Sequence, residues 1–60
     1  MESPSLGDWV RRRRRTLDLT QAELAAVVGC APITIRKIES DERRPSRLMA
    51  ERIALGLGLD

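Results

Sequence analysis

The sequence predicts an all-α fold, a compact bundle of four short helices in one domain. Three observations support this prediction. Apolar residues recur at helical spacing in short segments. Capping residues and glycines separate these segments. Trp9 is the only aromatic residue among the 60 residues of the chain, so the core must be aliphatic. An aliphatic core of this size suits a helical bundle better than a β-sandwich.

The first two predicted helices are marked by capping residues. Ser5 is an N-cap for a helix over 5–17, with Asp8 placed to close a capping box. Thr20 opens a helix over 20–28, because Glu23 follows three residues later and an apolar run begins behind it. Gly29 is placed to end that helix in the left-handed conformation.

The third helix, over 32–40, begins with Pro32, whose missing N–H is harmless in the first turn. Ser46 is an N-cap for a fourth helix over 46–55, after which two glycines interrupt the pattern. Residues 1–4 are expected to form a flexible tail before a single domain over 5–60. The bundle therefore has four helices, with room for a fragment of a fifth at its C-terminal end.

The same spacing predicts which side chains face the core, and Cys30 is expected to be a small, partly buried packing residue. Trp9 is expected in the core or at a domain-docking surface. The predicted core positions are Leu6, Val10 and Leu17, then Leu24, Ala25 and Val28, then Ile35 and Ile38, and finally Met49 and Ile53.

Basic residues are clustered, although the net charge is only +2 and the pI is about 9.5. The clusters lie at 11–15, at 36–37 and at 43–47. Clustering of this kind indicates a basic face for an anionic partner. The five arginines at 11–15 cannot share one helical face. They form either a solvated surface or a strip that contacts phosphates, and a targeting role is less favoured.

The sequence lacks the signals that are typical of several other classes of function. With one cysteine and no histidine, the chain has neither a disulfide pair nor a zinc-finger spacing. No general base or glycine-rich phosphate loop stands out, so we expect no enzyme, no cofactor and no metal. No apolar run approaches the roughly 18 residues that span a bilayer, and no signal-peptide core is present. The expectation is a soluble, cytoplasmic protein.

The second and third predicted helices form the most informative pair. Two short helices joined by a tight turn at Gly29 have the lengths of a helix-turn-helix. In that geometry the second helix of the pair lies in the DNA major groove, and the first crosses the sugar-phosphate backbone. Amide groups at the N-terminus of the first helix can bind a phosphate.

The residues of this pair resemble a known family. The matching segments are Thr20-Gln21-Ala22-Glu23-Leu24-Ala25, Val28-Gly29, Thr34-Ile35 and Ile38-Glu39, followed by Arg44-Pro45. They are similar to the Cro and phage-repressor type of helix-turn-helix, the lambda-repressor-like XRE family. The resemblance extends from about residue 6 to residue 57, nearly the whole chain.

The resemblance implies a transcriptional regulator that binds double-stranded DNA, as a homodimer or with further domains of a larger protein. Gln21 would bind a phosphate, and residues after the recognition helix would contact others. Arg14 and Glu39 match positions that form a buried ion pair in related repressors. The family continues into a fifth helix that completes the core and often the dimer contact. The DNA-binding residues implied are Gln21, Pro32, Ile33, Thr34, Arg36, Lys37, Ser40, Arg43 and Arg44.

The recognition helix departs from the family in its first turn. Glutamine or serine is common where this chain has Pro32 and Ile33. Proline cannot hydrogen-bond a base edge, and isoleucine can touch only a thymine methyl group or a sugar. Hydrogen bonding to bases therefore falls on Arg36 and Lys37, with guanine as the favoured partner.

A second class of function uses the same fold, because helix-turn-helix domains also serve as protein-docking modules. A basic face around the third helix favours DNA. An apolar patch around Trp9 or Leu57 without a basic face would favour a protein partner.

Overall fold

The predicted fold class is confirmed by the computed structural model, which describes residues 5–58. Within this range the chain forms four helices and no strand: α1 (Leu6–Thr16), α2 (Gln21–Val28), α3 (Pro32–Glu39) and α4 (Arg47–Gly56). The expected tail over 1–4, and residues 59–60 at the C-terminal end, lie outside the described residues. The expected fragment of a fifth helix is not tested by this part of the chain.

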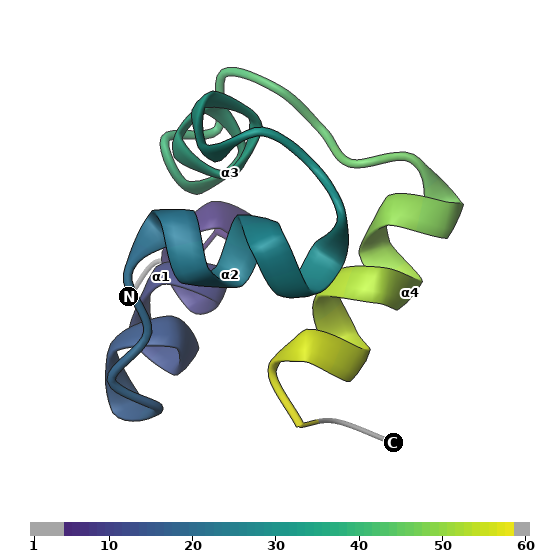
Figure 1. The fold of residues 1–60 in the computed structure, drawn as a ribbon. Helices are drawn as coiled ribbons and strands as arrows, with labels where there is room; N and C mark the ends of the chain where they lie inside the picture. The colour runs from purple at the N-terminus through teal and green to yellow at the C-terminus, as the bar shows by residue number, and fades with distance from the viewer. Residues whose placement is uncertain (1–4, 59–60) are drawn as a thin grey trace.

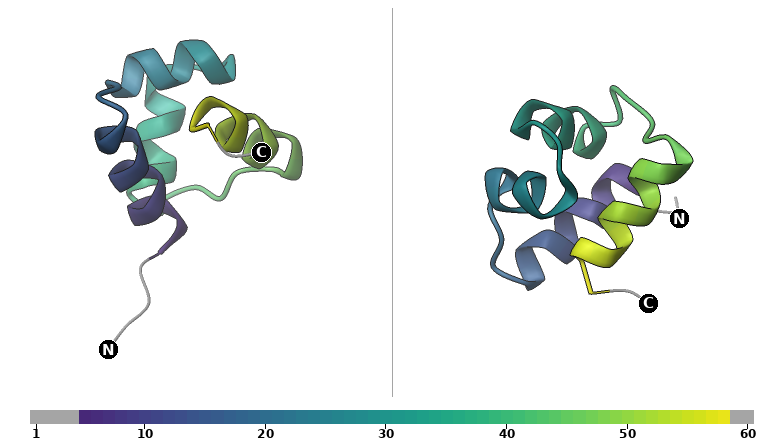
Figure 2. Two further views of the ribbon diagram at one scale, coloured as in Figure 1. Left: turned by 90° about the horizontal axis from the view of Figure 1, so that it is seen from below. Right: turned by 45° about the vertical axis from the view of Figure 1, so that its right-hand side comes forward.

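The α2–α3 pair forms the centre of the bundle. Helices α2 and α3 pack against each other, α1 packs against α3, and α4 packs against α2. Figure 1 shows α3 above α2, with the connection from α3 arching over to α4 at the side. Figure 2 shows the bundle from two further directions, and in its right-hand view α1 and α4 lie on the same side of the central pair. The helix-turn-helix therefore packs against both remaining helices, with α1 on α3 and α4 on α2.

The predicted N-caps are confirmed. Ser5, Thr20 and Ser46 each accept a hydrogen bond from the backbone N–H three residues later, at 3.0–3.2 Å. At α2 the glutamate Glu23 also accepts the N–H of Thr20 at 2.9 Å, so the capping box is complete. The capping box predicted at α1 is wrong for Asp8, whose side chain does not complete it. The carboxylate of Asp8 turns instead to two arginines that follow it on α1, at 3.0 and 3.5 Å.

Left-handed residues end the helices, as predicted for Gly29 (φ 87°). Two aspartates also adopt this conformation, Asp18 after α1 (φ 57°) and Asp41 after α3 (φ 63°). At Asp41 the chain forms a Schellman turn: its N–H bonds the carbonyl of Ile38 at 3.1 Å, and the next N–H bonds the carbonyl of Lys37 at 2.9 Å. The turn folds the chain back over the last turn of α3.

The core is aliphatic, as predicted, and draws on all four helices. The partly buried side chains of Leu19, Cys30 and Met49 pack against it, as expected for Cys30 and Met49. The buried members are Val10, Leu24, Ala25, Val28, Ile35, Ile38, Ile53 and Leu57.

The prediction that Leu6 and Leu17 face the core is wrong, since they are 53% and 39% exposed. The buried stripe of α1 is narrow and consists of Gly7, Val10 and Arg14. Leu6 lies beside this stripe, and Leu17 is the C-cap residue, beyond the last full turn.

Gly7 allows α1 to approach α3 at very short range. A Cβ atom on Gly7 would lie 2.4 Å from the carbonyl oxygen of Ile38 and 2.5 Å from that of Glu39. The N–H of Gly7 donates to the Asp41 carboxylate at 3.2 Å. Amides in the first turn of a helix have no acceptor within the helix, so Asp41 provides the hydrogen-bond partner for this one. Sequence spacing did not reveal this contact, because it joins residues 34 positions apart.

We expect Gly7→Ala to destabilise the domain by about 1–3 kcal/mol or more, because the new Cβ meets backbone atoms that cannot rotate away. Gly56→Ala is the matched control, since Gly56 is also helical and its Cβ would meet mainly the side chain of Val27 at 3.1 Å. Alanine there gains helix propensity of about 0.5–1 kcal/mol, so we expect little net change. Urea unfolding followed by circular dichroism measures both. Equal stability of the two variants would contradict the close approach at Gly7.

Candidate nucleic-acid interface

A buried ion pair lies beneath the candidate interface and joins α1 to α3. Arg14 and Glu39 are only 9% and 4% exposed. The guanidinium donates from Nε to Oε2 of Glu39 at 2.7 Å and from Nη2 to Oε1 at 3.1 Å. Its Nη1 donates to the carbonyl of Leu19 at 2.8 Å. The structure thus has the pair that the family resemblance implied, in bidentate geometry.

Hydrogen bonding favours the charged form of Arg14 in this buried pair. The hydrogen bond that Arg14 donates to the Glu39 carboxylate raises the pKa of Arg14, and its effect exceeds the opposing effect of desolvation. No buried side-chain polar atom among the described residues lacks a hydrogen-bond partner. Removing either partner would therefore leave an uncompensated charge in the interior, which is far more costly than the pair itself.

Gln21 begins α2 and connects the ion pair to the candidate phosphate site. Its side chain is half-buried, and Nε2 donates to Oε1 of Glu39 at 3.1 Å. At the same helix end, the N–H of Glu23 is bonded to Thr20, so the amides of Gln21 and Ala22 are the ones placed to meet an anion. The hydrogen bond with the Thr20 backbone lowers the pKa of Glu23, which stays ionised in the first turn.

The outer face of α3 is exposed as the helical spacing predicted. Pro32, Ile33, Arg36 and Lys37 are exposed, Thr34 is half-buried, and the two isoleucines of the inner face are buried. The N-cap residue of α3 provides no side-chain hydrogen bond. Two cations, Arg36 and Lys37, and two apolar side chains, Pro32 and Ile33, are thus exposed on this helix.

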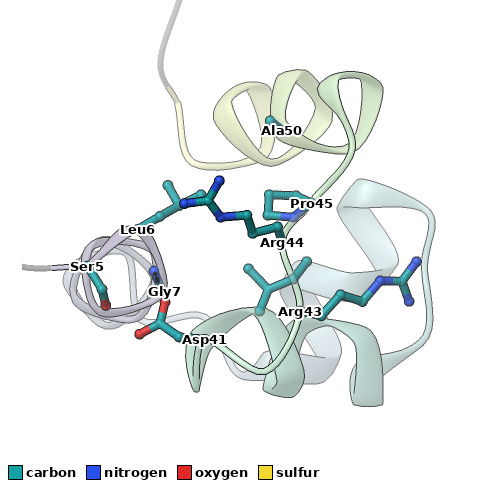
Figure 3. Close-up of a pocket in the computed structure, with 9 residues that line it drawn as sticks. Ser5, Leu6, Gly7, Asp41, Arg43, Arg44, Pro45 and Ala50 are labelled. Atoms are coloured by element: carbon teal, nitrogen blue, oxygen red, sulfur yellow. Dashed lines mark hydrogen bonds between the residues drawn. The ribbon is translucent and has the colours of Figure 1, made fainter.

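The three residues predicted to contact phosphates after α3 do not form one cluster. Ser40, Arg43 and Arg44 are all exposed. Figure 3 shows Arg44 extending across a surface hollow toward Leu6, while Arg43 points the opposite way. The hollow has a volume of about 610 Å³ and lies between the start of α1 and the α3–α4 connection. The two arginines would thus meet different parts of a bound polyanion.

One residue of the interface was missed by the sequence prediction. The carboxylate of Glu42 lies 3.6 Å from Nη1 of Arg36, and it also accepts a hydrogen bond from Ser40 Oγ. Both groups of the Arg36–Glu42 pair are about half-exposed. By contrast, no carboxylate of residues 5–58 forms an ion pair with Lys37. The two cations of α3 are therefore in different electrostatic environments.

The arginine run of α1 is divided among several roles. Arg11 and Arg12 pair with Asp8, and Arg14 is buried. Arg13 donates from Nε to the carbonyl of Leu57 at 3.1 Å, which joins α1 to the end of α4. This division favours a solvated and structural role for the run over a continuous phosphate-binding strip.

The two candidate partners, DNA and another protein, would need different surfaces. Leu57 is fully buried, and Trp9 is 39% exposed beside a shallow apolar hollow between α1 and α4. The exposed cations expected for a DNA partner lie on α3 and its following connection, with the exposed carboxylate of Glu42 among them. No group of acidic, cysteine or histidine side chains in the described part could hold a metal ion. No helix there is long and apolar enough to cross a membrane.

The fold is that of a helix-turn-helix domain of the XRE type. The helix-turn-helix family model matches residues 10–60, and the chain belongs to that family. An uncharacterised HTH-type transcriptional regulator of Methanothermobacter thermautotrophicus is 45% identical over 49 residues, which cover 82% of this chain and 71% of the relative.

Solved structures of the P22 c2 repressor are similar over almost the full chain. The crystal structure in complex with synthetic operator 9T has a TM-score of 0.92 at 26% identity, covering 97% of this chain and 88% of the repressor chain. The solution structure of the P22 c2 DNA-binding domain has a TM-score of 0.94 at 27% identity, covering 100% and 79% of the two chains.

We expect Glu39→Ala to lower the free energy of unfolding by about 3–5 kcal/mol, because Arg14 would remain buried without its partner. Glu51→Ala is the control, since Glu51 pairs with Arg47 at 3.7 Å on the exposed side of α4. An exposed pair of this kind contributes at most about 1 kcal/mol. Urea unfolding followed by circular dichroism compares the two. A similar small loss in both variants would show that the buried pair is not needed for stability.

Proposed function

We propose that this domain binds double-stranded DNA in a sequence-specific manner, as part of a transcriptional regulator, with α3 in the major groove. The observation that carries the proposal is the exposed face of α3, with Arg36 and Lys37, in a fold that superposes on an operator-bound repressor over 97% of the chain. Binding, rather than catalysis, is the proposed activity.

The contacts divide into those that position the domain and those that recognise bases. The amides at the start of α2, together with Gln21, are suited to a backbone phosphate. Ser40, Arg43 and Arg44 would hold further phosphates from the α3–α4 connection. Because these groups meet only the sugar-phosphate backbone, they set register without selecting sequence.

Recognition of bases rests on the outer face of α3. Arg36 and Lys37 can donate to the O6 and N7 acceptors of guanine. Ile33, which is 49% exposed, can contact a thymine methyl group, and Thr34 lies beside it at the edge of the face. Pro32 contributes shape at the start of the helix but no hydrogen bond.

Useful affinity requires more than one such face, since a single α3 covers only a few base pairs. We infer a homodimer or a larger regulator that places two copies on one duplex. Two symmetric domains would then recognise half-sites about 34 Å apart, or a multiple of that distance.

Binding to a labelled duplex at several salt concentrations tests the proposal. We expect affinity to fall steeply with salt, with a log–log slope of about −0.9 for each phosphate neutralised. A random duplex library supplies the probe, and the enriched sequence defines the preferred site. Absence of binding at low salt, both for the chain and for two copies joined in tandem, would refute DNA binding.

Two substitutions test the assigned roles. We expect Lys37→Ala to reduce the preference for the enriched sequence, whereas Gln21→Ala should weaken all sequences alike. Arg12→Ala is the charge control for Lys37→Ala, because Arg12 is exposed on α1 and pairs there with Asp8. Circular dichroism monitors folding, since Gln21 also bonds Glu39. The same effect from the Lys37 and Gln21 variants would refute the division into recognition and positioning.

A further inference from the structure

We propose that Glu42 is a specificity-determining residue that acts through Arg36. It holds the Arg36 side chain and lowers the affinity of this face for phosphates, so that Arg36 engages DNA chiefly where a base offers a better partner. The inference rests on the proposed function and assigns a role to an acidic group in a surface that faces a polyanion.

The position of Glu42 is fixed by the backbone. Asp41 is left-handed, and the Schellman turn that it forms returns the chain toward α3. The N–H of Glu42 donates to the carbonyl of Lys37 at 2.9 Å, which anchors the residue against the last turn of the helix. The carboxylate is thereby held on the side of α3 that carries Arg36.

The carboxylate connects the recognition helix with the phosphate-binding connection. Its Oε2 lies 3.6 Å from Nη1 of Arg36 and accepts the hydroxyl of Ser40. Ser40 Oγ also lies 3.2 Å from the carbonyl of Lys37, but the hydroxyl has one proton and the shorter contact is to Glu42. Both a predicted base-binding group and a predicted phosphate-binding group therefore have an internal acceptor.

The Arg36–Glu42 pair is weak enough to be exchanged. Its side chains are 52% and 54% exposed, and solvent screens ion pairs of this kind strongly. A bidentate contact between arginine and guanine is stronger, because two charge-assisted hydrogen bonds form at once. A guanine at the right position can therefore replace Glu42 as the partner of Arg36.

Mixed-sequence DNA offers mainly phosphates, and there Glu42 acts against binding. Its carboxylate competes with phosphates for Arg36 and partly cancels the positive charge of that side chain. Since the sequence-independent part of affinity comes from phosphate neutralisation, the loss falls most heavily on non-specific sites. The ratio of specific to non-specific affinity, which determines useful recognition, then rises.

The test compares Glu42→Gln with Glu51→Gln. Glutamine retains an acceptor for Ser40 but has no charge, and both variants gain one unit of net charge. Glu51 pairs with Arg47 on α4, outside α3 and its following connection. The probes are a mixed-sequence duplex and the duplex that the wild-type chain enriches from a random library.

We expect Glu42→Gln to bind the mixed-sequence duplex more tightly, by up to about eightfold at 0.1 M salt, with a log–log salt slope steeper by about 0.9. Affinity for the enriched duplex should rise less, so the preference for it falls. Glu51→Gln should change both affinities little and equally. In an Arg36→Ala background, the effect of Glu42→Gln should largely disappear.

The outcomes separate this inference from the proposed function. If the wild-type chain binds neither duplex, the proposed function fails. If it binds DNA but Glu42→Gln behaves like Glu51→Gln, or has the same effect without Arg36, the role of Glu42 is overturned while DNA binding stands.

Discussion

The hydrogen-bonded pair of Arg14 and Glu39 determines how the other parts of this small domain can be arranged. It joins α1 to α3, the same carboxylate accepts the side chain of Gln21 on α2, and the guanidinium binds the carbonyl of Leu19 between α1 and α2. An aliphatic core alone tolerates shifts of one helix along another, because its contacts are non-directional. The bidentate pair has strict geometry, so it accepts one placement of these three helices, and with it the placement of the recognition face.

Local signals in the sequence predicted where the helices begin. The end of α3, by contrast, depends on a contact between residues that are distant in the chain. Thr20 and Glu23 cap α2 within four residues of each other, so their pattern is visible in the sequence. Asp41 is different, because aspartate adopts the left-handed conformation only occasionally. Its carboxylate bonds the N–H of Gly7, which is distant in the chain. That contact also explains why α1 buries a glycine where spacing predicted leucines.

The candidate site was predictable to the extent that it follows helical periodicity. The exposed positions of α3 and its buried isoleucines follow from residue spacing, whereas the ion pair beneath them came only from the family resemblance. The electrostatic difference between Arg36 and Lys37 was not predictable, because it depends on Glu42, which a turn outside the helix brings into place. The divergence of Arg43 and Arg44 likewise depends on the path of an irregular connection, for which the sequence has no periodic signal.

The hydrogen bond from Arg13 to the carbonyl of Leu57 bears on how the domain opens. It joins α1 to the C-terminal end of α4 across 44 positions of the chain, and helix ends are where fraying ordinarily begins. Fraying of α4 from this end must break a contact held by α1, and α1 in turn is fixed to α3. Local opening at the C-terminal end is therefore coupled to the middle of the bundle, which favours unfolding of the domain as one cooperative unit.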